Sequence, residues 1–276
     1  MNRPVIEKDY FVEGRKCHYA FLDGDSALSP IVFLHGVTTF GHYFDDVISH
    51  MNLENSIYLM DFKGHGKSDW KNDYYTIESY SDDIYSFLES LDFPVHIVGH
   101  SLGGRVGIHL TATYPDAIKS LSILDVAPSV DMAGFMRLAN AISKVPIPFD
   151  DRDHVIDFYT NIWGASKRFI EMMLEYGIKP EQNDQLSARF DPNIFSLPMD
   201  IIQSEIDELW KASRSIKQPT LIVRGEHSDV LSPEIAKELQ TAIPHADYVE
   251  IKNSSHSIPP EQPQALANVI QSFIVD

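Results

Sequence analysis

A serine between two glycines, at the abrupt end of an apolar run, is the strongest chemical feature of this sequence. Residues 95–98 are mostly β-branched and lead into Gly99-His100-Ser101-Leu102-Gly103, which has the pattern G-x-S-x-G. Between a strand and a helix, this pattern is typical of a tight turn that exposes the serine hydroxyl, and glycine at 99 and 103 avoids the clashes of larger side chains. It predicts nucleophilic attack by Ser101, with unpaired amides at the start of the following helix available to an oxyanion. The pentapeptide alone is also compatible with a glycine-rich turn that carries an incidental serine.

Partners for such a serine must come from distant parts of the chain. A serine hydroxyl is a weak nucleophile until a base removes its proton. Asp125, Asp229 and His256 each follow directly after a predicted strand, as Ser101 does, and so does the turn His35-Gly36. Ligands bind parallel sheets at the carboxyl ends of the strands, so we expect these residues to gather at one edge. We also expect the His35-Gly36 turn to be either a tight structural turn or the source of an oxyanion-binding amide.

Strands and helices that alternate along the chain must position these side chains. A short hairpin is predicted first, and helices then separate short apolar runs of the kind found in strands buried on both faces. This alternation predicts an α/β fold with a mostly parallel sheet and right-handed crossovers. The predicted strands are 10–12, 16–20, 31–34, 56–61, 95–98, 120–124, 220–225 and 247–251; the predicted helices are 41–51, 76–91, 105–113, 233–242 and 259–274.

The segment 127–213 differs from the rest of the chain. It is rich in methionine and aromatic residues, is interrupted by prolines, and has no run typical of a buried strand. We expect a subdomain of several short helices here, inserted into a core domain formed by residues 1–126 and 214–276. Its composition predicts an apolar pocket wall.

Composition narrows the classes of partner. The 276 residues, 43% of them hydrophobic, are enough for a large core, and the formal net charge of −18 disfavours nucleic acid and anionic membranes as partners. Cys17 is the one cysteine, so no internal disulfide can form. We find no secretory signal, no apolar stretch near the roughly 18 residues of a membrane span, and no metal-ligand spacing such as H-E-x-x-H. These features predict a cytoplasmic protein without a metal.

Taken together, the motifs resemble those of the α/β-hydrolase fold superfamily. The resemblance covers essentially the whole chain. It implies an eight-stranded, mostly parallel sheet flanked by helices, and an inserted helical cap over the site. The motifs that carry it are His35-Gly36, the 61–68 loop, the serine turn, Gly225-Glu226-x-x-Asp229, and His256 followed by Glu261-Gln262-Pro263.

The resemblance also implies roles for single residues. Ser101 is the expected nucleophile, His256 the general base and then acid, and Asp229 the carboxylate that orients the imidazole. The backbone N–H groups of Val37 and Leu102 are the expected oxyanion hole, and no cofactor is implied.

Asp125 is the alternative acid, because some members of the superfamily carry the acid after the sixth strand. We favour Asp229 because its loop matches the common family pattern and is long enough to bring a carboxylate beneath His256. Asp125 lies at the start of the cap segment, where a carboxylate can instead bind loop N–H groups.

The resulting prediction is a cofactor-free serine hydrolase that cleaves small carboxylic esters through an acyl-enzyme. Thioesters, lactones, carbon–carbon bonds of diketone-like substrates and perhydrolysis remain alternatives, because they use the same side chains. A small-molecule receptor with slow or no turnover is the alternative from a different class.

Overall fold

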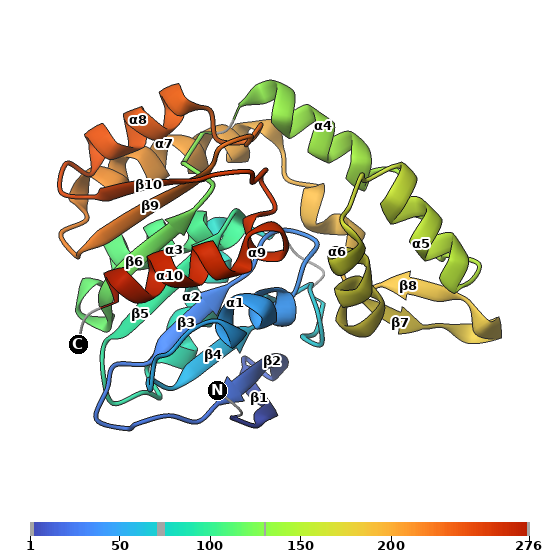
Figure 1. Ribbon diagram of the computed structural model, residues 1–276, viewed down its shortest axis with the longest axis horizontal. Coiled ribbons are helices and arrows are strands. Elements are labelled where there is room, and N and C mark those ends of the chain that lie inside the picture. The colour runs from blue at the N-terminus through green and yellow to red at the C-terminus, as the bar shows by residue number, and fades with distance from the viewer. Residues whose placement is uncertain (1–2, 71–74, 130, 275–276) are drawn as a thin grey trace.

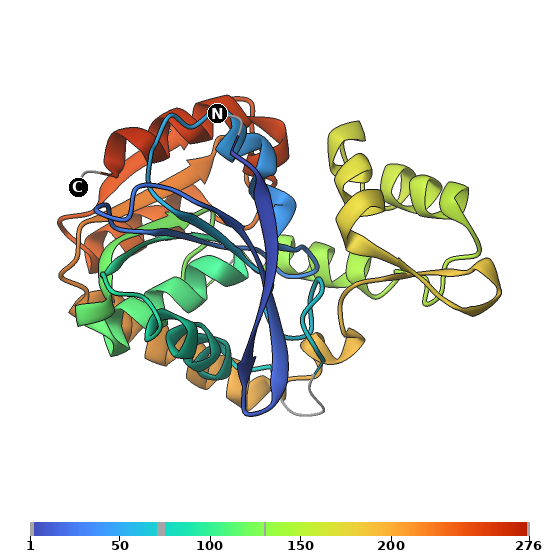
Figure 2. The same ribbon diagram turned by 90° about the horizontal axis from the view of Figure 1, so that it is seen from below.

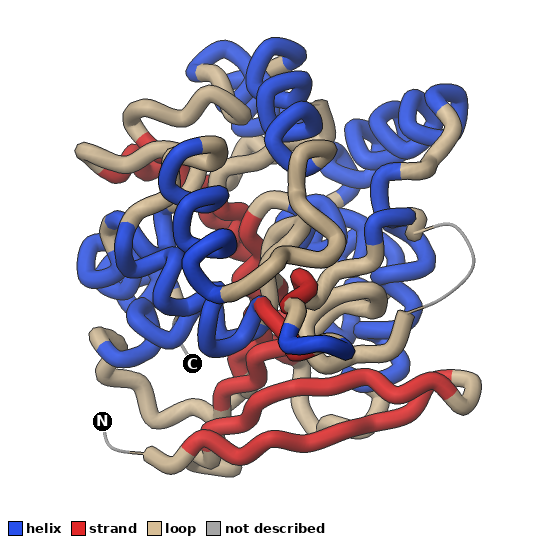
Figure 3. Tube along the Cα trace, turned by 90° about the vertical axis from the view of Figure 1, so that its right-hand side faces the viewer, coloured by secondary structure: helices blue, strands red, loops and turns tan. Residues whose placement is uncertain are grey.

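A central sheet of eight strands organises the computed structural model, which describes residues 3–70, 75–129 and 131–274 (Figure 1). The strands stand side by side in the order β1-β2-β4-β3-β5-β6-β9-β10. Only β2 runs antiparallel to its two neighbours among the strands described, so the predicted mostly parallel sheet is confirmed. The strands are β1 (Val5–Val12), β2 (Arg15–Leu22), β3 (Ile31–Leu34), β4 (Ile57–Met60), β5 (Val95–His100), β6 (Ile118–Leu124), β9 (Thr220–Gly225) and β10 (Asp247–Ile251). The β1–β2 hairpin forms the outer edge and is longer than its sequence pattern predicts (Figure 3).

Helices cover both faces of the sheet in two layers (Figure 2). One layer consists of α1 (Asp45–Ser49), α9 (Ile258–Glu261) and α10 (Pro263–Phe273), with the short turn η1 (Gly41–Phe44) leading into α1. The other consists of α2 (Ile77–Leu88), α3 (Leu102–Thr113), α7 (Met199–Ser215) and α8 (Pro233–Ala242), and the turn η2 (Pro115–Ala117) follows α3.

Capping side chains determine where two of these helices begin, and apolar residues on both faces of the strands bury the sheet. The Thr76 side chain caps α2 by accepting from Ser79 N, and Ser232 caps α8 in the same way, as its Ser-Pro-Glu sequence predicts. Residues of β3 alternate between two apolar clusters: Val32 and Leu34 face one layer of helices, while Ile31 and Phe33 face the other. The central strands are therefore buried on both sides, and only their ends are free to form a site.

The inserted segment stands apart from the core, as Figure 1 shows. It is not purely helical, because a short antiparallel strand pair, β7 and β8, lies among its helices. Its elements are α4 (Met132–Ile142), α5 (Arg152–Asn161), α6 (Lys167–Met172), η3 (Met173–Gly177), β7 (Ile178–Pro180), η4 (Gln182–Asp184), β8 (Leu186–Ala188) and η5 (Pro192–Phe195).

The expected boundary at residue 213 differs from the structure. Residues 199–213 belong to α7, which packs on α3 and α8 of the core with Leu209 and Ser213 buried. The amphipathic face of this long helix is covered by α3, so the part that stands apart, here called the cap, ends before Met199.

Candidate active site

Ser101 lies in a strained turn between β5 and α3. Its backbone has φ 53° and ψ −115°, a conformation that non-glycine residues rarely adopt and that is concentrated at functional sites. A methyl group on Gly99 would overlap the carbonyl of Gly103, and one on Gly103 would overlap the carbonyl of Leu34. The two glycines of the G-x-S-x-G pattern are therefore required by close backbone packing, as the sequence predicts.

His256 faces Ser101 from the loop that follows β10. Its Nε2 lies 3.1 Å from Ser101 Oγ. The loop is held from two sides: the His100 imidazole donates from Nε2 to the His256 carbonyl (2.8 Å), and Glu261 accepts from both the amide and the hydroxyl of Ser255 (2.7 Å each). His100 is thus a support for the loop, and burial lowers its pKa to about 3.

Asp125, and not Asp229, is the carboxylate beside His256. Asp125 Oδ2 lies 2.7 Å from His256 Nδ1, and Oδ1 accepts from Gly225 N at 2.8 Å. The side chain is fully buried, and its φ of 54° places the residue in a sharp turn directly after β6. Ser228 Oγ donates a further hydrogen bond to Oδ2 (2.5 Å). The structure therefore joins Asp125, His256 and Ser101 in one line of hydrogen bonds.

The prediction that Asp229 orients the imidazole is wrong. Its carboxylate is about half exposed and forms an ion pair with Arg137 of α4 in the cap. Asp229 points away from His256 because consecutive side chains in the loop after β9 point in opposite directions: Ser228 points toward Asp125 and Asp229 toward the cap. The buried Ser228 side chain is turned toward Asp125, which leaves its neighbour on the outer face toward the cap. The length and pattern of the loop predicted its position near the site, but not the side chain that faces inward.

Val37 and Leu102, the expected donors of the oxyanion hole, directly follow Gly36 and Ser101 in the chain. Leu102 is the first residue of α3, so its N–H has no acceptor within the helix. The turn that precedes Val37 lies close to the serine, because a Cβ atom on Gly36 would stand 3.2 Å from Cβ of Ser101. Buried His35 fixes this turn: it donates from Nδ1 to Gly36 O (2.7 Å) and accepts from Phe62 N at Nε2 (3.0 Å).

A cavity of about 230 Å³ opens between the cap and the core at His256. Its wall is mostly apolar and aromatic on the cap side, and the ion-paired Arg137 and Asp229 supply charge at one side. The cap residues that line it are Gly134, Arg137, Leu138, Ala141, Ile162, Trp163, Gly164, Ala165, Ser166 and Phe169; the core residues are Asp229, Val230, Ser255, His256, Ser257, Pro260 and Glu261.

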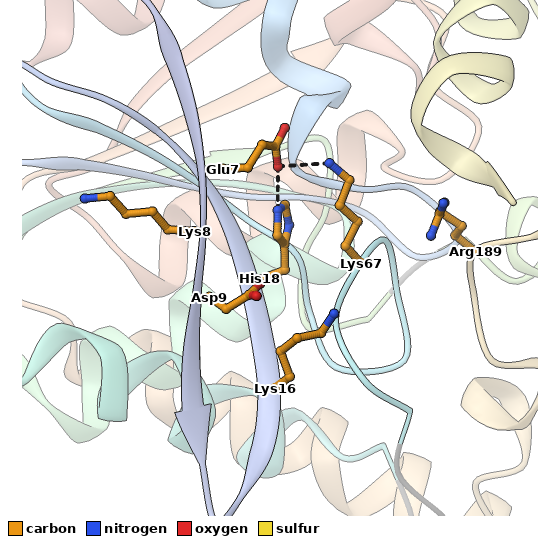
Figure 4. Close-up of a pocket in the computed structure, with 7 residues that line it drawn as sticks. All are labelled: Glu7, Lys8, Asp9, Lys16, His18, Lys67 and Arg189. Atoms are coloured by element: carbon orange, nitrogen blue, oxygen red, sulfur yellow. Dashed lines mark ion pairs between the residues drawn. The ribbon is translucent and has the colours of Figure 1, made fainter.

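A larger hollow of about 460 Å³ lies beside the β1–β2 hairpin (Figure 4), and none of Ser101, Asp125 and His256 lines it. Its walls carry mainly charged side chains. The Glu7 carboxylate pairs with the side chains of His18, His42 and Lys67. Among the described residues, no serine lines it, whereas His256 lines the smaller cavity and lies 3.1 Å from Ser101 Oγ, so we place the reacting centre beside the smaller cavity.

The described residues include neither a cluster that could hold a metal ion nor a helix suited to cross a membrane. Across the described ranges, no group of three or more His, Cys, Asp or Glu side chains is arranged to hold a metal ion. Within the same ranges, none of the helices combines the length and the apolar character needed to cross a membrane.

Known proteins resemble this chain in sequence and in fold. A family model described as alpha/beta hydrolase fold matches residues 29–263. An sn-1-specific diacylglycerol lipase from Mus musculus is 25% identical, with 93% of this chain and 84% of the lipase covered. A 2-(acetamidomethylene)succinate hydrolase from Mesorhizobium japonicum is 26% identical, with 88% and 87% covered. A crystal structure of E-2-(acetamidomethylene)succinate hydrolase superposes with a TM-score of 0.86 at 22% identity over 98% of this chain and 99% of that one.

The chain belongs to the α/β-hydrolase fold family. Within that family it is a hydrolytic enzyme of the carboxylic ester hydrolase class.

Two residues that support the site were not predicted from the sequence in these roles. Ser228 binds the carboxylate of Asp125, and Glu261 holds Ser255. Glu261 belongs to the segment that carried the family resemblance, but its pattern does not reveal which amide it binds. Ser228 lies within the Gly225–Asp229 motif at a position that the pattern leaves unspecified, so no signal in one sequence distinguishes it.

Proposed function

We propose that the protein hydrolyses small carboxylic esters by a double displacement at Ser101. The observation that carries the proposal is the line of hydrogen bonds from Asp125 through His256 to Ser101. His256 Nε2 accepts the proton of the Ser101 hydroxyl as Oγ bonds to the ester carbonyl carbon, and the carbonyl becomes a tetrahedral oxyanion. Asp125 accepts from Nδ1–H, which fixes the tautomer and stabilises the imidazolium.

The amides of Leu102 and Val37 are the proposed donors to the oxyanion. The start of α3 supports the first, and the close approach of the Gly36 turn to Ser101 supports the second. Such donors are placed where negative charge develops, and losing one typically costs about 10²–10³ in rate.

The second half of the reaction restores the enzyme. His256 returns its proton to the alkoxide oxygen, so the alcohol leaves and the acyl group stays on Ser101 as an ester. Water then gives a proton to His256 and its oxygen to the acyl carbon, and the tetrahedral intermediate releases the carboxylic acid and the serine hydroxyl. Every proton is accounted for by His256, so the cycle needs no cofactor.

The cavity between cap and core supports a short acyl group as the substrate. Its volume of about 230 Å³ is below the 300–1,000 Å³ typical of sites for drug-sized ligands. Trp163 and Phe169 supply apolar surface on the cap side of this cavity. The curated relatives carry names for different substrates, which fits a cap that decides specificity while the core supplies the chemistry.

Turnover of p-nitrophenyl esters tests this function. We expect kcat/KM to be highest for acetate or butyrate and to fall by at least about tenfold at decanoate, because the longer chain exceeds the cavity. Initial rates on thioesters and lactones of matched acyl length, measured beside the esters, distinguish the alternative hydrolases. Ser101→Ala is the control for background hydrolysis.

Two results would contradict the proposal. A single stoichiometric release of p-nitrophenol without further turnover would indicate a receptor-like protein. Highest activity on the decanoate ester would mean that the acyl group lies outside this cavity.

A further inference from the structure

The loop of residues 228–231 touches both the cap and the carboxylate of Asp125. We propose that this loop is a positioning device: cap helix α4 holds Asp229 and Val230 on one side, and the adjacent Ser228 thereby holds Asp125 against His256 on the other. The inference rests on the proposed function, because it assigns Asp125 the role of the catalytic acid.

On the inner side, the hydroxyl of Ser228 has one possible orientation. Its oxygen accepts hydrogen bonds from Val230 N (3.3 Å) and Leu231 N (3.0 Å). The hydroxyl proton is therefore left for Asp125 Oδ2, at 2.5 Å. Because both amides belong to the same loop, the position of the hydroxyl follows the conformation of that loop.

On the outer side, three contacts in α4 and just before it attach the cap. Asp131 N donates to Val230 O (2.9 Å), Gly134 packs so closely on the Asp229 carbonyl that a Cβ atom would overlap it, and Arg137 pairs with the Asp229 carboxylate. Asp131 directly precedes α4, whereas Gly134 and Arg137 lie three positions apart within it and share one helix face, which is docked on this loop.

The backbone of the 228–231 loop connects the contact with Asp125 to the contacts with the cap. Consecutive Cα atoms are about 3.8 Å apart, so a shift of Asp229 or Val230 of an ångström also moves Ser228. Arg137, Asp229 and His256 all line the same cavity, so a bound substrate contacts the cap attachment and the reacting centre together. We therefore assign Asp229 and Arg137 as positioning residues that act on Asp125 through Ser228.

A second ion pair between cap and core provides a matched control. Arg168 of α6 binds Asp46 of α1 through two hydrogen bonds of 2.6 and 2.7 Å. This pair also attaches the cap to the core, but neither residue touches the 228–231 loop or lines the cavity at His256. Its removal reports the cost of weakening cap attachment in general.

The first experiment compares Arg137→Gln, Asp229→Asn, the double variant, and the double control Arg168→Gln/Asp46→Asn, all with p-nitrophenyl acetate. We expect each single variant at the loop to lower kcat by about threefold to fivefold, since an exposed ion pair contributes modestly. The double variant should be no worse than either single one, because both remove the same contact. The control should leave kcat within about twofold of wild type.

The pH dependence of kcat/KM separates positioning from simple charge effects. If the two side chains acted only through their charges, Arg137→Gln and Asp229→Asn would shift the acidic limb of the profile, where kcat/KM falls at low pH, in opposite directions. Positioning predicts that both shift it upward, because Asp125 with a weakened Ser228 bond attracts the proton of His256 more strongly. Opposite shifts, additive losses, or a control as impaired as the loop variants would overturn the inference.

Substitution of Ser228 tests the inner contact directly. Ser228→Ala should lower kcat by about tenfold, as expected for a hydrogen bond to a charged group, and raise the acidic limb by about half a pH unit. Ser228→Thr, which keeps the hydroxyl, should recover most of both effects. An unshifted limb in Ser228→Ala would overturn the inference even if the protein loses stability. Inactive wild-type protein would overturn the proposed function itself, whereas an active enzyme with unaffected loop variants would overturn the inference alone.

Discussion

Asp125→Asn should lower kcat by about 10⁴ while the fold stays intact, because the imidazole loses the partner that sets its tautomer and stabilises its charge. Asparagine has nearly the same shape as aspartate and can still accept from Gly225 N, which donates to Asp125 at 2.8 Å. The variant therefore removes charge with little loss of packing. Steady-state kinetics on p-nitrophenyl acetate measure the loss, and circular dichroism with a thermal melt checks the fold.

Asp229→Asn is the matched control for the same chemical change after a neighbouring strand. Its carboxylate is about half exposed and pairs with Arg137, so we expect at most about a tenfold loss. A folded Asp125→Asn enzyme with nearly wild-type kcat, beside a severely impaired Asp229→Asn enzyme, would contradict the assignment of the acid.

Acid should destabilise the protein steeply between about pH 6 and pH 4. Burial lowers the pKa of His35 to about 4, and the pKa values of His65 and His100 each to about 3. The unfolded chain takes up these protons near pH 6.5, so in this window it binds about three more protons than the folded chain. The stability contribution is fully present above pH 6.5 and is lost as the pH falls, by about 4 kcal/mol per pH unit.

His42 contributes with the opposite sign and in a different window. Burial opposes its charged form, but Asp45 and Glu7 outweigh burial and raise its pKa. Its contribution is present below the unfolded pKa and is lost as the pH rises above it, so it does not cancel the acid effect.

Urea denaturation at pH 7, 6, 5.5 and 5 measures this dependence. His65→Gln keeps a donor for the Lys63 carbonyl, which His65 Nδ1 contacts at 3.1 Å, and removes one buried imidazole. Its slope should be shallower by about 1.4 kcal/mol per pH unit, whatever its stability at pH 7. An equal slope in this variant, or a wild-type stability that is flat from pH 7 to pH 5, would contradict the assignment of neutral buried histidines.

The sequence predicted the sheet and the serine turn because local rules determine both. Strands such as β3 and β9 are short apolar runs buried on both faces, and helices of fitting length separate them. At the turn, Gly99 and Gly103 are required by contacts within a few residues or with an adjacent strand. Such features leave a pattern in the chain itself.

The identity of the acid depended on the direction of single side chains, which no pattern encodes. Asp125 and Asp229 both follow strands at the same edge, and their loops differ by backbone angles such as the φ of 54° at Asp125. The boundary of the cap at α7 was missed for a related reason. An amphipathic helix has the same pattern whether its apolar face packs on the cap or on α3.

Covalent labelling with a fluorophosphonate tests the central claim, that Ser101 is a nucleophile activated by His256 and Asp125. We predict one adduct per chain, located on Ser101 by peptide mass spectrometry, no adduct in Ser101→Ala, and labelling of Asp125→Asn that is slower than that of Asp229→Asn. An adduct on another serine, or active enzyme that forms none, would contradict it.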